Sequence, residues 1–286
     1  MIRHLVNLFK FRIGVMMMIT ALVAMMITPG RSLGFLEILV LALAVLASAA
    51  AAGAFNQYYE TDLDARMERT KDRPFVTGEL HKSPLWLLLI VSLVLVSAIA
   101  ATLVLNVATA VWIFLGAFFY AIVYTVWLKR RTWMNIVIGG ASGSFAVLAG
   151  AAAVSPQMQA VPVLLALVLF FWTPSHFWSL AIARHDDYAS VGIPMLPVVM
   201  GDQRAAKVVL ANTLVLVGFS IMPFFFGMSW IYLAGAVSGG GYFIYTNVQM
   251  IKNPESKVAM KSFMASLLQL VLLLSGAVLD HLILSG

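Results

Sequence analysis

Long uninterrupted runs of apolar residues, separated by short polar breaks, dominate this sequence. Windows of about 20 apolar residues, the length that crosses the hydrocarbon core of a bilayer as a helix, recur along the chain. The runs do not alternate in pieces of about 10 residues, the pattern of a membrane β-barrel. The ranges that meet the criterion are 13–29, 35–57, 84–105, 108–128, 133–154, 160–183, 206–226, 229–248 and 263–284. We therefore predict an all-α, polytopic membrane bundle with one transmembrane helix for each of these nine ranges.

The composition agrees with a membrane protein and limits its chemistry. Hydrophobic residues make up 62% of the chain and charged residues 10%, whereas a soluble domain is roughly 25% charged. The chain has no cysteine, which excludes disulfides, thiolate metal sites and cysteine nucleophiles. The predicted outer connections carry almost no charge, so we expect no extracellular domain and a single transmembrane domain over residues 1–286.

The basic residues gather on one side of the predicted arrangement. If the N-terminal segment with Lys10 and Arg12 is cytoplasmic, alternating spans place 17 of the 18 Lys and Arg residues on that side and only Arg31 on the other. This distribution follows the positive-inside rule, so we predict a cytoplasmic N-terminus and a location in the inner (cytoplasmic) membrane. The net charge of +6 follows from this topology and does not indicate nucleic-acid binding.

The first long cytoplasmic loop, at about 58–83, begins within an unusual concentration of charge. Residues 56–78 hold five of the 12 acids and four of the 18 bases. Asn56, Glu60 and Asp64 lie at i, i+4 and i+8, so a helix that continues past the membrane edge would stack their side chains on one face. Mg²⁺ binds one or two carboxylates together with substrate phosphates, and neighbouring Arg and Lys donate to phosphate oxygens. The pattern predicts a Mg²⁺–diphosphate site.

A second acidic pair favours this prediction over a simpler interpretation. On their own, the charges of the first loop could be solvated i, i+4 pairs such as Asp62 with Arg66. Asp186 and Asp187, however, lie in the other long cytoplasmic loop, at about 184–205, against a mostly apolar background. Ionisable residues at membrane depth are expensive and generally functional, so two acidic loops on one side indicate a shared site.

Three further groups have both a structural and a functional interpretation. Lys129 and Arg130 follow a predicted span, where they either anchor the topology or bind a diphosphate. Tyr120 and Tyr124 precede them and belong either to an interfacial aromatic belt or to a substrate site. His176 lies in an aromatic segment and is either a neutral histidine bonded to a neighbouring helix or a ligand contact.

Nine positions within residues 56–78 form one motif. The motif reads Asn56-x3-Glu60-x2-Leu63-Asp64-x2-Met67-x-Arg69-Thr70-x2-Arg73-x4-Gly78. It resembles the signature of the UbiA-type intramembrane prenyltransferases. That resemblance implies a bundle of transmembrane helices around a central cavity, with two Asp-rich motifs that bind Mg²⁺ and an isoprenoid diphosphate.

The rest of the chain is similar to the branch of that family that farnesylates heme. The residues that carry this similarity are Tyr124-Thr125-x2-Leu128-Lys129-Arg130-x-Thr132, Asn135, Gly139-Gly140, Trp172 to Trp178, Asp187 to Val199, Phe263, Ser266 and Asp280. The similarity implies transfer of a farnesyl group from farnesyl diphosphate to a vinyl group of protoheme IX (heme B), with addition of water, giving heme O and diphosphate. It also implies association with heme A synthase or with the assembly of a terminal oxidase.

The resemblance further implies a role for each candidate residue. The residues expected to hold two Mg²⁺ ions are Asn56, Glu60 and Asp64 for one, and Asp187 with Asp186 for the other. The expected diphosphate donors are Arg69, Arg73, Lys129 and Arg130. Asp62 is expected to lie beside the metal ligands without binding the metal itself. His176 is expected to contact heme as an axial ligand. Asn56, Glu60, Asp64 and Asp187 are therefore the catalytic candidates.

The chain also departs from the pattern of that branch. Lys10-Phe11-Arg12 stands where Lys-Pro-Arg is common, and Ser144-Phe145-Ala146-Val147 stands where a Pro-Pro pair is common. The resemblance implies that these positions lie in the cavity wall or at its entrance and outside the metal motif, so the identity of the acceptor is the open point. The alternatives are a prenyltransferase for a quinone precursor or another aromatic acceptor, a membrane transporter and a non-catalytic heme chaperone. Transport is disfavoured because the acids gather at one interface instead of the bilayer midplane.

Overall fold

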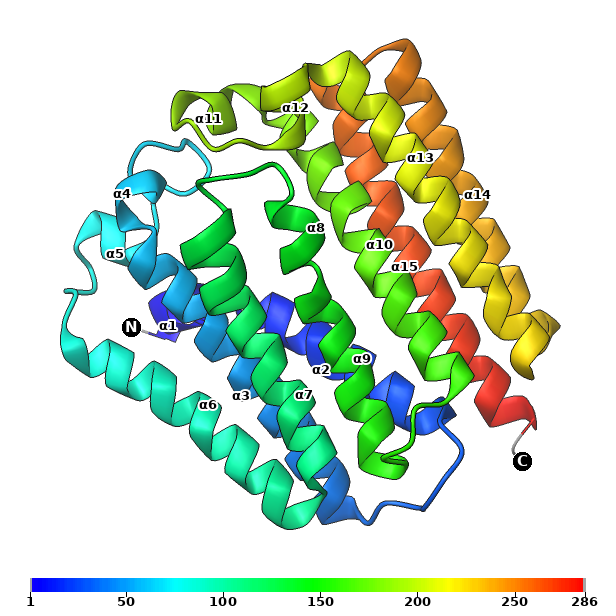
Figure 1. Cartoon of the computed structure of the whole chain (residues 1–286). Coiled ribbons are helices and arrows are strands. Elements are labelled where there is room, and N and C mark those ends of the chain that lie inside the picture. Colours follow the sequence, from blue (N-terminus) through cyan, green and yellow to red (C-terminus); the bar gives the residue numbers. More distant parts are fainter. Residues whose placement is uncertain (1, 285–286) are drawn as a thin grey trace.

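The computed structural model describes residues 2–284 as a bundle of helices, and this part of the chain contains no strand, which confirms the all-α fold class (Figure 1). The first half contains α1 (Ile2–Leu8), α2 (Phe11–Ile27), α3 (Phe35–Tyr59), α4 (Thr61–Asp64), α5 (Pro74–Thr77), α6 (Pro84–Val104), α7 (Val107–Phe118), the π-helix η1 (Phe119–Leu128), α8 (Asn135–Gly139) and α9 (Ala141–Val154). The second half contains α10 (Ala160–Ala183), α11 (His185–Ser190), α12 (Leu196–Met200), α13 (Asp202–Ile221), the 3-10 helix η2 (Met222–Phe226), α14 (Trp230–Lys252) and α15 (Ser256–Leu284).

Each predicted apolar range coincides with one long helix or with two consecutive helices. Among the described residues, seven of these helical segments are long and apolar enough to cross a membrane. The first, α2, is apolar but has only 17 residues, and α14 has the length but contains three consecutive glycines and Asn247, which lower its mean hydropathy. The chain is thus a multi-pass membrane protein, whereas nine spans and a cytoplasmic N-terminus stay predictions.

A closed ring of helices forms the centre of the bundle. Around the ring, each helix packs against the next in the order α2, α3, α7, α9, α10 and α15, and α15 packs against α2. On one side α6 covers α3 and α7, and on the other α13 and α14 cover α10 and α15 (Figure 1). The functional site described below lies inside this ring.

Close helix crossings and buried polar contacts hold the bundle together. At the crossing of α2 and α9, Gly150 lies so near the backbone that an added Cβ would stand 1.9 Å from the carbonyl oxygen of Ala21. Between α14 and α15, the buried carboxylate of Asp280 accepts hydrogen bonds from the backbone N–H groups of Ser229 (3.1 Å) and Tyr232 (3.3 Å). These N–H groups begin α14 and have no partner within the helix, so Asp280 has a capping role.

The short helices α4, α5, α11 and α12 gather at one end of the bundle (Figure 1). Both acidic loops belong to this end, and they touch, because the backbone N–H of Glu68 donates to Oδ1 of Asp187 at 3.0 Å. The expectation that the two acidic loops share one side of the molecule is therefore confirmed.

Candidate active site

The end of α3 aligns the three oxygen-bearing side chains of the first motif. The helical pattern of backbone hydrogen bonds continues through it, from Glu60 N to Asn56 O (3.0 Å) and from Asp64 N to Glu60 O (2.9 Å). Asn56, Glu60 and Asp64 are 2%, 0% and 3% exposed, although they lie next to an otherwise exposed loop. The predicted i, i+4, i+8 stacking is thus present, and its face points into the protein.

Each of these three side chains is paired with a cation of the chain. Lys10 donates from Nζ to Oδ1 of Asn56 at 2.6 Å, Lys129 forms a salt bridge with Glu60, and Arg73 donates to Oδ2 of Asp64 at 2.5 Å. Both salt bridges are largely buried. Away from solvent an ion pair interacts strongly, and loss of one partner is costly because it leaves a buried charge unpaired. The second carboxylate oxygen of Glu60, Oε1, is buried without a hydrogen-bond partner among the described residues.

The π-helix η1 brings the third inner segment to the same place. Its wider turn is seen in a backbone hydrogen bond between residues five apart, from Lys129 N to Tyr124 O (2.9 Å). The side-chain Oγ1 of Thr125 likewise donates to the carbonyl oxygen of Tyr120, five residues earlier, at 2.8 Å. Thr125 also accepts from Nδ2 of Asn56 at 3.1 Å. Isolated π-helical turns are frequent at functional sites. Here the turn places Tyr120, Tyr124 and Lys129 along one wall of a cavity.

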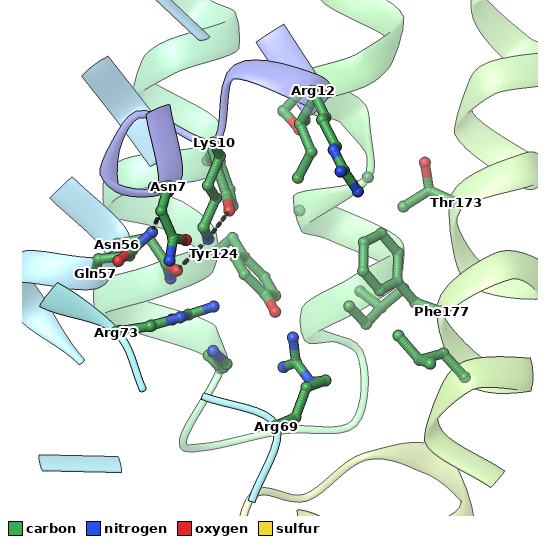
Figure 2. A pocket seen from close by; sticks show the side chains of 18 of the residues that line it. Asn7, Lys10, Arg12, Asn56, Gln57, Arg69, Arg73, Tyr124, Thr173 and Phe177 are labelled. Atoms are coloured by element: carbon green, nitrogen blue, oxygen red, sulfur yellow. Dashed lines mark hydrogen bonds between the residues drawn. The ribbon is translucent and has the colours of Figure 1, made fainter. Parts of the chain in front are cut away.

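This cavity, of about 560 Å³, is strongly basic. Its cationic side chains come from three separate segments and are Lys10, Arg12, Arg69, Arg73 and Lys129. No carboxylate lines it among the described residues, because Glu60 and Asp64 lie behind their cationic partners. Figure 2 shows Lys10, Arg12, Arg69 and Arg73 on several sides of one open space, with Thr173 and Phe177 of α10 on another side. A polyanion is the ligand that such a wall favours.

Lys10 has an unusual backbone and an unusual environment. It adopts the left-handed conformation (φ 44°) between α1 and α2, a strained state for a residue with a side chain. Gly53 leaves room for it, since a Cβ there would lie 3.2 Å from Cβ of Lys10. Burial lowers the pKa of Lys10 well below its ordinary value, and the nearby charge of Arg73 adds to the shift. Its ammonium also donates to the hydroxyl of Tyr120 at 2.9 Å.

A second, apolar cavity of about 320 Å³ adjoins the first. The two share the lining residues Arg12, Ile13, Tyr120, Ser142, Thr173 and Phe177. Residues of all six ring helices contribute to the apolar cavity, among them Met16, Ser48, Trp112, Ala146 and Leu270. The ring thus encloses two adjoining spaces, one with a basic wall and one with an apolar wall.

His176 lies in the wall of the apolar cavity. It is 7% exposed, its Nδ1 is 2.7 Å from Oγ of Ser266, and its ring lies between Trp172 and Phe263. The bond to a neighbouring helix agrees with the first interpretation made from the sequence. The residue also lines a cavity, whereas its contact with a ligand stays a prediction.

The structure places the remaining predicted site residues apart from this cavity. Arg130 forms a two-pronged salt bridge with Asp62 (2.8 and 2.9 Å) at the surface, and these hydrogen bonds lower the pKa of Asp62. Arg130 is absent from the cavity wall, in contrast to Arg69, Arg73 and Lys129. Asp186 is exposed, and Asp187 is engaged by the backbone of Glu68. In the described part of the chain, no three His, Cys, Asp or Glu side chains are grouped as metal ligands.

The role of two cavity residues was not predicted from the sequence. The family resemblance placed Lys10 and Arg12 in the cavity wall or at its entrance, and both do line the cavity, but they were not predicted to be part of its basic wall. Their charge directly at the membrane edge is the signal that could have suggested this role, and the positive-inside rule already accounted for it. The sequence placed Tyr120 and Tyr124 either in an interfacial aromatic belt or in a substrate site, and in the structure both line the basic cavity.

Comparisons with known proteins agree with this architecture. The sequence model of the UbiA prenyltransferase family matches residues 17–272. Two relatives from Paramagnetospirillum magneticum, protoheme IX farnesyltransferase 2 and protoheme IX farnesyltransferase 1, are 51% and 43% identical. The first alignment covers 99% of this chain and 98% of the relative, and the second covers 95% of each. The structure of a UbiA homologue from Archaeoglobus fulgidus bound to DMAPP and Mg²⁺ superposes with a TM-score of 0.71 at 13% identity, over 94% of this chain and 98% of that one. This protein therefore belongs to the UbiA prenyltransferase family.

Proposed function

We propose that this protein transfers the farnesyl group of farnesyl diphosphate to a vinyl group of heme B, giving heme O and diphosphate. In this reaction the bond between the allylic carbon and the diphosphate oxygen breaks, and a carbon–carbon bond to the vinyl group forms. Water then adds to the resulting cation as the hydroxyl group of the product, and its released proton goes to the diphosphate or to solvent. Two relatives that align over nearly the whole chain are named protoheme IX farnesyltransferases.

The observation that carries the proposal is the contrast in polarity between the two adjoining cavities. Within residues 2–284, five bases and no carboxylate line the first cavity, whereas the second is apolar. A prenyl diphosphate has the same division, with a polyanionic head and a hydrocarbon tail. Arg69, Arg73 and Lys129 are the proposed donors to the head group, and Lys10 and Arg12 join them. The pairing of Arg130 with Asp62 favours a role at the surface for both.

The residues at the cavity's edge fit a divalent cation. Oε1 of Glu60 is buried and unpartnered, and the side-chain oxygens of Asn56 and Asp64 share its face. Because Mg²⁺ usually takes only one or two carboxylates and completes its ligands with phosphate and water, a set of three acids is unnecessary. We propose Asn56, Glu60 and Asp64 as the ligands of one Mg²⁺. For a second Mg²⁺ we propose Asp187 with Asp186, in the loop that touches the first acidic loop at Glu68. When bound, Mg²⁺ would neutralise the charge that develops on the departing diphosphate.

The chain's own residues provide the other requirements of the reaction. Basic side chains that already surround the anion site stabilise negative charge on the leaving group without reorganising. The apolar walls exclude bulk water from an allylic carbon that becomes cationic, and aromatic faces such as Phe177 can stabilise that charge. His176, at the apolar end, is the proposed contact for the acceptor.

The one-sided distribution of bases supports an inner-membrane location with the loop end in the cytoplasm. Heme B and farnesyl diphosphate are the proposed small-molecule partners, and association with heme A synthase or with terminal-oxidase assembly is also proposed.

An assay that compares different acceptors in parallel reactions tests the proposal. Purified protein in detergent, supplied with farnesyl diphosphate and Mg²⁺, should convert heme B to a species that has gained one farnesyl group and one water by mass spectrometry. 4-Hydroxybenzoate and a naphthoate, offered in parallel, should give no product. Prenylation of an aromatic acid alone would overturn the heme assignment and leave a prenyltransferase with another acceptor.

A further inference from the structure

The imidazole of His176 is fixed on both faces and at one end. Its ring stacks on Trp172 with centroids 4.2 Å apart and on Phe263 with centroids 4.3 Å apart. Two rings cannot share one face at these separations, so they enclose the imidazole from opposite sides. At its edge, Nδ1 lies 2.7 Å from Oγ of Ser266, which belongs to α15.

The surroundings of Ser266 determine which atom carries the hydrogen in that contact. Oγ of Ser266 also lies 2.6 Å from the carbonyl oxygen of Phe263. A carbonyl only accepts, and a serine hydroxyl has one hydrogen, so this hydrogen is used in the bond to Phe263. Ser266 can then only accept from His176, and Nδ1 must donate.

The other ring nitrogen follows from this assignment. No acid forms a salt bridge with His176 among the described residues, and a buried imidazole without one is neutral, with a single N–H. With the hydrogen on Nδ1, the lone pair is on Nε2. In the described part of the chain Nε2 has no hydrogen-bond partner, and His176 lines the apolar cavity.

We propose that Ser266 is a positioning residue that holds His176 in the Nδ1–H tautomer, so that Nε2 is the nitrogen that ligates heme iron. The ligation rests on the proposed function, whereas the tautomer does not. Metal-binding histidines generally donate their other N–H to a neighbouring acceptor, which orients the ring and strengthens the ligand. The chain from His176 through Ser266 to Phe263 supplies such an acceptor without a carboxylate.

The tautomer can be measured without heme by ¹⁵N NMR of histidine-labelled protein, with the signals of His176 identified by their loss in His176→Gln. We expect a protonated Nδ1 and an unprotonated Nε2 in the wild type. Ser266→Ala should shift the ring toward the Nε2–H form. The control is Ser262→Ala, which removes another fully buried hydroxyl one turn away on α15, bonded to Asn247 and facing Ser179. An Nε2–H wild type, or an unaltered ring in Ser266→Ala, would overturn the assignment.

Titration with ferric heme B, followed by absorption and electron paramagnetic resonance, tests the ligation. The wild type should give a histidine-ligated spectrum that His176→Gln loses. Ser266→Ala should weaken heme binding about 10-fold or more, the usual effect of removing such a partner, whereas Ser262→Ala should not. All variants should still bind farnesyl diphosphate, which reports an intact fold.

The outcomes separate the inference from the proposed function. Equal losses in Ser262→Ala and Ser266→Ala would mean a general packing role and overturn the positioning role. An unchanged spectrum in His176→Gln would overturn the ligation while heme remained the acceptor. A wild type that binds farnesyl diphosphate and no heme would contradict the heme assignment, and the NMR result would still decide the tautomer.

Discussion

Single residues determine the charge balance of the site. Asn56, Glu60 and Asp64 are buried at the membrane edge, and each is held by a basic side chain that also lines the cavity. The same cations can therefore balance the chain's own carboxylates and donate to a diphosphate, because both partners are anionic oxygens. Stability and substrate binding are coupled at these positions.

Replacing Lys129 with methionine tests this coupling. The substitution leaves Glu60 charged, 0% exposed and without its cation, so we expect a loss of about 3–5 kcal/mol in the free energy of unfolding. The double variant Lys129→Met/Glu60→Gln should recover much of this loss, since no buried charge then lacks a partner. Unfolding of the purified protein in detergent measures both, and additive losses would contradict the pairing.

Two aspartates of one loop provide a matched pair for catalysis. Asp64 is buried against Arg73 at the cavity's edge, whereas Asp62 forms an exposed salt bridge with Arg130. We expect Asp64→Asn to lower kcat/KM about 100-fold or more, the cost of losing one charge-stabilising group in an active site. Asp62→Asn should leave kcat/KM nearly unchanged, because surface salt bridges contribute little. Steady-state assays at saturating Mg²⁺ measure both, and equal effects would contradict the assignment.

The sequence predicted the motif residues better than the residues around them. The spacing of Asn56, Glu60 and Asp64 was sufficient to predict one face, because a helix fixes which side chains are neighbours. The pairing of Arg130 with Asp62, and the hydrogen bonds of Lys10 to Asn56 and Tyr120, depend on how distant segments meet. No local pattern contains that information.

Helices, rather than loops, set the dimensions of the cavity. The crossing of α2 and α9 is close because Gly150 has no side chain, and the π-helical turn in η1 turns Tyr124 and Lys129 toward the basic space. The apolar ranges predicted the helices well, since hydrophobic length is a strong signal. The π-helical turn could not be predicted, because nothing in hydropathy distinguishes its extra residue per turn.

A pair of glycine substitutions on α9 tests the close crossing. Gly150→Ala would place a Cβ 1.9 Å from the carbonyl oxygen of Ala21, so α2 and α9 must separate, at a cost of about 1–3 kcal/mol. In Gly143→Ala, the nearest neighbour of the added Cβ would be Cδ1 of Leu169, at 4.0 Å. Because alanine is more favourable than glycine in a helix by about 1 kcal/mol, this substitution should not lower the free energy of unfolding. Thermal unfolding in detergent compares them. If Gly150→Ala is as stable as Gly143→Ala, the crossing is looser than described.

For the molecule as a whole, the ring of helices joins two spaces of opposite character at one end of the bundle. The basic cavity is lined by residues of the first acidic loop, and the apolar cavity is lined by the long helices. This gradient predicts both the orientation of a prenyl diphosphate and the sidedness of the protein. Sidedness could be argued from the sequence alone, whereas the position of the two cavities next to each other required the packed structure.

The absence of cysteine makes the orientation directly measurable. Single cysteines can be introduced at exposed Asp72, in the first acidic loop, and at exposed Gln157, between α9 and α10. A membrane-impermeant thiol reagent added to intact cells should label Gln157→Cys, while Asp72→Cys should be labelled only after the membrane is opened. Labelling of Asp72→Cys in intact cells would reverse the predicted topology.

The central claim is that this chain makes heme O, and the heme pigments of expressing cells test it most directly. Membranes that contain the wild-type protein should yield, by liquid chromatography and mass spectrometry, a heme that has gained one farnesyl group and one water. Membranes with an equal amount of Asp64→Asn should yield heme B with little of that species. Identical pigments from the two, or a farnesylated aromatic compound in place of the modified heme, would contradict the account.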